Sequence, residues 1–137
     1  MIEFCFESEF DLANQDRLRR WISDVILSEG FEVGEITYVF CSDDYLHKLN
    51  MKFLNHDTLT DIISFDYCLG KQINGEIFIS IDRVAENASE FQVDFNTELH
   101  RVMIHGILHY CGYNDTTEDE VAEMRRMEDS ALLQLAS

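Results

Sequence analysis

Proline is absent from this sequence, and basic residues are scarce: 10 lysines and arginines stand against 27 aspartates and glutamates. Because proline interrupts helices, its absence leaves every helical segment free to run unbroken. The formal net charge of −17 opposes adsorption to nucleic-acid backbones or to anionic lipid by overall charge. Any contact with a nucleic acid must therefore be local.

Long apolar segments and paired cysteine motifs are also absent. No apolar run approaches the roughly 18 residues that indicate a transmembrane helix, and the N-terminal segment MIEFCFESEF carries acids where a signal peptide carries basic residues. The four cysteines form no CxxC pair, which argues against a zinc ribbon or a thioredoxin-type redox pair. We therefore expect a cytoplasmic protein without membrane contact, whose thiols are buried and not paired in disulfides.

A length of 137 residues and a hydrophobic content of 46% are typical of one globular domain, spanning 1–137. Alternating or β-branched apolar residues predict strands at 1–6, 33–40, 60–65 and 75–81. Apolar residues at helical spacing predict about five helices, at 14–28, 42–50, 82–91, 96–111 and 117–135. The last two strands should pair antiparallel, and a register break is expected near Gly34. This pattern predicts a single α+β domain.

The most informative segment is HGILHYCGYND at 105–115. His105 and His109 lie four residues apart on a predicted helix, so their imidazoles share one face, with Cβ atoms about 5–6 Å apart. Gly112 can adopt the left-handed conformation that ends a helix, and the chain then turns back so that Asp115 supplies a third ligand. Two imidazoles and a carboxylate suit Zn²⁺ and leave a fourth position open. The competing interpretation is a pair of core histidines that bind no metal.

Gly106, directly after the first histidine, narrows the chemistry. Glycine inside a helix costs about 1 kcal/mol relative to alanine, so its presence indicates that a backbone or a ligand approaches closely beside His105. Zinc peptidases of the HExxH type carry at this position the glutamate that acts as general base. Since glycine stands there, peptide cleavage by that mechanism is not expected.

The last predicted helix begins with a capping box formed by Thr117 and Glu120. Its apolar stripe is most simply part of the core, and consists of Val121, Met124, Ala131, Leu132 and Leu135. Its charged residues are most simply a solvated face, and are Glu123, Arg125, Arg126, Glu128 and Asp129. Neither set indicates a binding site.

Beyond the spacing, HGILHYCGYND resembles the HGxLHLxGYDH motif of the YbeY family, bacterial metal-dependent endoribonucleases that act in ribosomal RNA maturation. Further segments resemble the family over most of the chain: TDIISF at 60–65, GEIFIS at 75–80 and TELHRVMIH at 97–105. The resemblance implies a four-stranded mixed sheet with helices around a central metal-binding helix. It also implies one Zn²⁺ per chain, held by His105, His109 and Asp115.

Two positions depart from the family pattern. Asp115 stands where the family usually has a third histidine; aspartate is an acceptable zinc ligand, but its charge should reduce the Lewis acidity of the metal. Leu54 aligns with an arginine that the family carries before the strand at 60–65. The candidates to supply the missing positive charge are Lys48, Lys52, His56 and Arg101. We take Arg101 and Lys52 as candidate substrate-binding residues, the alternative for Arg101 being an exposed cation that offsets nearby acids.

These observations favour a cytoplasmic, zinc-dependent endoribonuclease that cleaves single-stranded RNA. The expected setting is ribosomal RNA maturation and ribosome quality control, with ribosomal RNA and ribosomal proteins as partners and no DNA substrate. No general base is identified, because Ser64, Asp61 and Asn114 are candidates by proximity alone and a structural role is the simpler interpretation. The alternative is a ribosome-associated assembly or RNA-binding factor with a structural metal, which the charge of −17 and Leu54 favour. A hydrolase of peptides or small esters is a third hypothesis.

Overall fold

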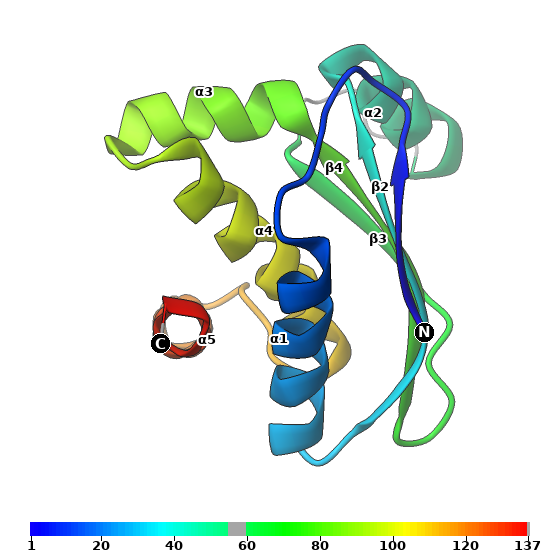
Figure 1. Cartoon of the computed structure of the whole chain (residues 1–137), viewed down its shortest axis with the longest axis vertical. Coiled ribbons are helices and arrows are strands. Elements are labelled where there is room, and N and C mark those ends of the chain that lie inside the picture. The colour runs from blue at the N-terminus through cyan, green and yellow to red at the C-terminus, as the bar shows by residue number, and fades with distance from the viewer. Residues whose placement is uncertain (55–59, 137) are drawn as a thin grey trace.

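A four-stranded sheet forms one side of the computed structural model, which describes residues 1–54 and 60–136, and most of the helices lie to the other side (Figure 1). Its strands are β1 (Ile2–Phe6), β2 (Glu32–Cys41), β3 (Ile62–Asp66) and β4 (Gln72–Ser80). The helices are α1 (Gln15–Ser28), α2 (Asp43–Leu49), α3 (Ile81–Phe91), α4 (Phe95–Tyr110) and α5 (Glu118–Ala136). A π-helical turn, η1 (Asn50–Leu54), follows α2 and is not predicted by the sequence pattern. Within the described residues, the predicted α+β domain is confirmed.

The sheet is mixed, with its strands in the order β1-β2-β4-β3. The strands β1, β2 and β4 run parallel, and β3 pairs antiparallel with β4 at the edge of the sheet. The expected antiparallel pair is therefore confirmed. The register of β2 against β4 shifts between Val33 and Ile36, which confirms the expected break near Gly34.

Helix α4 is the central helix of the domain. It packs against β3 and β4 and against α3 and α5, and Figure 1 shows it between the sheet and α5. Apolar residues on several of its faces are buried: Leu99, Val102, Met103, Ile104, Ile107 and Leu108. A helix that is apolar around most of its circumference belongs in a core. The central position expected for the helix of His105 and His109 is confirmed.

Two glycines let α4 and the sheet approach closely. A Cβ at Gly106 would lie 3.1 and 3.2 Å from the ends of two isoleucine side chains of the sheet. A Cβ at Gly75 of β4 would overlap the hydroxyl of Tyr110, which donates a hydrogen bond to the carbonyl of Phe65 over 2.9 Å. A close approach beside His105 is therefore present, but it is made by side chains of Ile62 and Ile77 and not by the backbone or ligand that the sequence indicated.

The start of α5 carries the predicted capping box. The N–H of Glu120 donates to Oγ1 of Thr117 over 3.1 Å, and the N–H of Thr117 donates to Oε1 of Glu120 over 3.0 Å. These reciprocal bonds satisfy backbone donors that have no partner inside a helix. They define where α5 begins, just after the loop that carries Asp115.

Residues 1–54 and 60–136 include no helix that is both long enough and apolar enough to cross a membrane. Within these residues the four cysteines are free thiols, as expected. Cys41 is buried, but Cys5 is exposed, so the prediction of buried thiols is wrong for Cys5. Cys5 lies on an edge strand, where alternate side chains face away from the core.

Candidate metal centre

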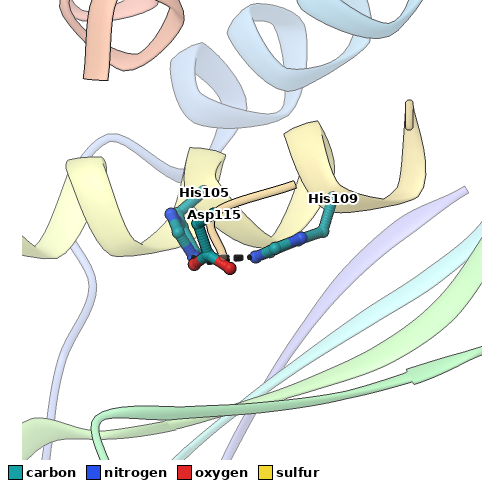
Figure 2. A group of neighbouring side chains, drawn as sticks. All are labelled: His105, His109 and Asp115. Atoms are coloured by element: carbon teal, nitrogen blue, oxygen red, sulfur yellow. Dashed lines mark hydrogen bonds and ion pairs between the residues drawn. The ribbon is translucent and has the colours of Figure 1, made fainter. Parts of the chain in front are cut away.

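The side chains of His105, His109 and Asp115 converge on one point (Figure 2). The Nε2 atoms of the two histidines are 3.0 Å apart, and Oδ2 of Asp115 lies 3.3 Å from each of them. Two ligands at the usual zinc distance of about 2.0–2.1 Å and at a tetrahedral angle lie about 3.3–3.4 Å apart. The three donor atoms therefore form a triangle close in size to one face of a tetrahedral zinc site.

Local chain geometry brings these donors together. His105 and His109 are one turn apart on α4, whose last residue is Tyr110. Gly112 then adopts a φ of +101°, and since nothing lies within 4 Å of a Cβ built there, the backbone conformation alone requires glycine. The N–H of Gly112 donates to the carbonyl of His109 over 3.0 Å, and the chain turns back toward the helix. The predicted left-handed turn is confirmed, and it brings Asp115 to both histidines.

The ligand triangle is open to solvent. The side chains of His105, His109 and Asp115 are 22%, 32% and 42% exposed. Within residues 1–54 and 60–136, no fourth histidine, cysteine or acidic side chain joins this group. Structural zinc sites usually have four protein ligands, whereas catalytic sites have three and keep one position open. The donor set and its exposure fit an open metal site.

A buried carboxylate lies behind His105. Glu128 of α5 is 5% exposed, so its assignment to a solvated face is wrong. Its Oε2 lies 2.6 Å from Nδ1 of His105, and its Oε1 accepts from Nη1 of Arg101 over 2.9 Å. Asp129 accepts from Nη2 of the same arginine over 2.6 Å. One carboxylate thus joins α4 and α5 directly beside the candidate ligands.

The sequence of α5 contains a signal for this burial. Glu128 follows Met124 by four residues and precedes Ala131 by three, so it falls on the apolar stripe of the helix. Met124 and Ala131 are buried in the core. An acidic residue at such a position indicates a group that is both buried and paired. The pattern alone does not identify the partner.

The contacts around His105 shift two pKa values in opposite directions. Burial alone would lower the pKa of His105, but the hydrogen bond and charge of Glu128, with further charge from Asp115 and Asp61, raise it above its ordinary value. Burial alone would raise the pKa of Glu128, but its bonds to His105 and Arg101 lower it. Both directions have the same cause, the contact between the two side chains, in which Glu128 carries the negative charge and Nδ1 of His105 carries the hydrogen.

A cavity of about 330 Å³ adjoins the ligand triangle and is lined in part by His105 and Asp115. Asp61 lines the same cavity; burial raises its pKa, and Nδ2 of Asn87 donates to its Oδ2 over 3.3 Å. The other two candidate bases, Ser64 and Asn114, are exposed and are not among the described residues that line this cavity. Of the three candidate bases, Asp61 is therefore the one that lines the cavity beside the ligand triangle.

The candidate substrate-binding cations lie in different settings. Arg101 pairs with Glu128 and Asp129, so it offsets nearby acids as the alternative interpretation expected. Its side chain is only 19% exposed, so it is not the exposed cation of that interpretation. Lys52 is exposed on η1, with its Nζ 5.3 Å from the ring centre of the adjacent Phe53. The remaining positions of this group are Lys48 and Leu54, both exposed, and His56, which lies outside the described residues. Contact of Arg101 or Lys52 with substrate stays a prediction.

Comparison with known proteins shows the family. A family model described as Endoribonuclease YbeY matches residues 4–136. The chain belongs to the YbeY family. It is 54% identical over 132 residues to the endoribonuclease YbeY of Flavobacterium johnsoniae, with 96% of this chain and 95% of that protein covered. It is 50% identical over 131 residues to the endoribonuclease YbeY of Christiangramia forsetii, with 96% and 92% covered.

A solved structure shares the fold of this YbeY family member. The solution structure of a protein from Thermotoga maritima matches with a TM-score of 0.69 and 26% sequence identity. The match covers 98% of this chain and 91% of that chain. Because nearly the whole chain is covered, the sheet, α4 and α5 all belong to the shared fold. The family and the fold class implied by the sequence motifs are therefore confirmed.

Proposed function

We propose that this YbeY family protein is a zinc-dependent endoribonuclease that cleaves single-stranded RNA in ribosomal RNA maturation and ribosome quality control. The observation that carries the proposal is the open triangle of His105, His109 and Asp115. Three protein ligands with solvent on the remaining side suit a metal that must meet a substrate. The endoribonuclease name of the matching family and relatives supports RNA as that substrate.

The donor set favours zinc over magnesium. Magnesium prefers oxygen ligands and retains several waters, whereas imidazole nitrogens suit zinc. We assign one zinc ion per chain to His105, His109 and Asp115. When bound, zinc would supply a Lewis acid that polarises the scissile phosphodiester. A negatively charged Asp115 should make this Lewis acid weaker than one held by three neutral histidines.

Side chains around the triangle can position RNA and move a proton. Asp61 lines the adjoining cavity, and its pKa, raised by burial, suits a carboxyl group that exchanges a proton with substrate or water. Lys52 is exposed and could form an ion pair with an RNA phosphate. Arg101 already pairs with Glu128 and Asp129, so it could bind RNA only while it keeps those contacts. Because the net charge of −17 repels RNA, such local contacts are needed.

Metal removal tests this proposal. Purified protein, stripped with a chelator, is assayed on an end-labelled single-stranded RNA and on a duplex of the same sequence. Cleavage of the single strand should be lost without metal, return with zinc, and fall by about 100-fold or more in His109→Ala. His100→Gln, on the same helix but outside the ligand triangle, is the matched control and should cleave normally. Cleavage that survives both chelation and His109→Ala would overturn the mechanism.

The acidic composition favours a second candidate function, a ribosome-associated assembly factor in which the metal is structural. A net charge of −17 suits docking on basic ribosomal proteins, which would bring the chain to RNA. Co-sedimentation with ribosomal subunits that survives Asp115→Ala, together with no cleavage by the wild-type protein, would favour this function. Cleavage by the wild type that is lost in Asp115→Ala would exclude it as the whole explanation.

A further inference from the structure

Glu128 contacts His105 at Nδ1, the ring nitrogen that does not face the other two candidate ligands. Its Oε2 lies 2.6 Å from Nδ1 of His105, whereas Nε2 of the same imidazole lies 3.0 Å from Nε2 of His109 and 3.3 Å from Oδ2 of Asp115. The two ring nitrogens of His105 therefore have separate partners on opposite sides of the ring. In a metal-ligating histidine, the hydrogen bond at one nitrogen determines which nitrogen is left to bind the metal.

The chemistry of Glu128 determines the direction of this hydrogen bond. The side chain of Glu128 is 7% exposed, and both of its oxygens have partners: Oε2 contacts His105 and Oε1 contacts Arg101. An ionised carboxylate accepts hydrogen bonds and cannot donate them. The shared hydrogen must therefore be carried by Nδ1 of His105. This leaves Nε2 as the nitrogen that faces the other two candidate ligands.

Arg101 holds the carboxylate of Glu128, which in turn holds the imidazole of His105. Its Nη1 donates to Oε1 of Glu128 over 2.9 Å, and its Nη2 donates to Oδ1 of Asp129 over 2.6 Å. Arg101 and His105 are one turn apart on α4, so Glu128 of α5 bridges two successive turns of that helix. A carboxylate held at both oxygens has little freedom to rotate, and the imidazole bonded to it is restrained in turn.

We propose that Glu128 is a positioning residue, which fixes the tautomer and ring orientation of His105 so that Nε2 faces His109 and Asp115. The inference deepens the proposed function, because it rests on the metal site assigned above. Glu128 is not one of the three candidate ligands, and its carboxylate acts on them through Nδ1 of His105. Its action through His105 makes the packing of α5 on α4 part of the site.

The variant Glu128→Gln tests the proposal, because it preserves the shape of the side chain and removes its charge. Asp129→Asn is the matched control: it removes one negative charge from the same arginine, one residue away, without a contact to His105. Zinc affinity is measured for each by competition with a chromogenic chelator. We expect Glu128→Gln to weaken zinc binding by about 10–100-fold and Asp129→Asn by less than about two-fold. An unchanged affinity in Glu128→Gln, or equal losses in the two variants, would overturn the proposal.

A measurement on the wild-type protein keeps the proposal testable if Glu128→Gln does not fold. Nitrogen-15 NMR of the histidine side chains reports which ring nitrogen of His105 carries hydrogen and which binds zinc. We expect an Nδ1–H that exchanges slowly with water in the metal-free protein, and zinc on Nε2 in the loaded protein. A rapidly exchanging Nδ1–H, or zinc on Nδ1, would overturn the proposal. Failure of the wild type to bind zinc would overturn the proposed function, and the metal-free spectrum would still decide the contact between Glu128 and His105.

Discussion

His105 and His109 lie on the same face of one helix, but their surroundings differ. Nδ1 of His105 contacts Glu128, which is itself bonded to Arg101. Among the described residues, no hydrogen bond reaches Nδ1 of His109. We call His105, Glu128 and Arg101 the buried half of the site. The loop half consists of His109, Gly112 and Asp115, which one helical turn and one bend of the chain bring together.

The difference between the halves indicates that the rigidity of the site comes from the buried half. Side chains that are already restrained lose less conformational entropy when a ligand binds, so the buried half favours a defined metal position. The loop half ends in an exposed carboxylate, whose position can adjust when a substrate arrives at the open side. In the proposed metal site, one half would therefore fix the position of the metal and the other half would leave it accessible.

Substitution of each histidine in turn should give the largest effects on zinc affinity and stability, and it tests whether the two halves differ. Both His105→Ala and His109→Ala remove a ligand, so zinc affinity should fall by about 100-fold or more in each. In the metal-free protein, His105→Ala also leaves Glu128 buried without one of its partners and should cost about 2–3 kcal/mol of unfolding free energy. His109→Ala should cost less than about 1 kcal/mol. Urea unfolding in the presence of chelator measures both, and equal costs would refute the distinction between the halves.

Gly112→Ala sharpens the comparison on the loop side. Space is available for the added methyl group, but a φ of +101° is strained for any residue with a Cβ, at a cost of about 1–2 kcal/mol. If the bend positions Asp115, zinc affinity should fall together with stability. Thermal unfolding and chelator competition measure the two quantities. A destabilised variant with unchanged zinc affinity would show that Asp115 does not depend on this bend.

Tyr110→Phe tests how α4 is held against the sheet below the loop half. The phenol O–H donates to the carbonyl of Phe65 over 2.9 Å, so its removal should cost about 1 kcal/mol of unfolding free energy. Zinc affinity should change by less than about two-fold, because within the described residues the Tyr110 hydroxyl bonds to backbone carbonyls of the sheet and to none of the candidate ligands. A larger loss of affinity would mean that the anchoring of α4 to the sheet also sets the ligand geometry.

His100 gives the smallest expected effect and a contrast to the buried half. Burial, with the charge of Arg17 adding to it, lowers the pKa of His100, which packs edge-on against Trp21. The unfolded chain therefore takes up a proton at higher pH than the folded protein, so stability should fall as the pH drops through about 6.5. His100→Gln should remove this part of the pH dependence. Unfolding free energies measured near pH 7.5 and near pH 5.5 test it; an unchanged slope in the variant would contradict the assignment.

The strands, the main helices and the ligand triangle could all be predicted because their signals are local. Apolar periodicity marks strands and helices, and a four-residue spacing places His105 and His109 on one face whatever packs around them. Gly112 likewise has one conformational role, which the structure confirms. The burial of Glu128 could not be deduced in full, because a charged residue on a helix is usually solvated and its partner lies on another element.

The sequence by itself determined the α+β fold class, the YbeY motifs and the residues that form the ligand triangle, because backbone preferences and helical spacing act over a few neighbouring residues. Only the tertiary structure decided which nitrogen of His105 faces the triangle, and that Arg101 is held by Glu128 and Asp129. These contacts join residues 23 to 28 positions apart, and they form because α5 packs against α4 and removes Glu128 from water. A carboxylate taken out of water must find hydrogen-bond donors nearby, and the fold supplies them beside the candidate metal centre.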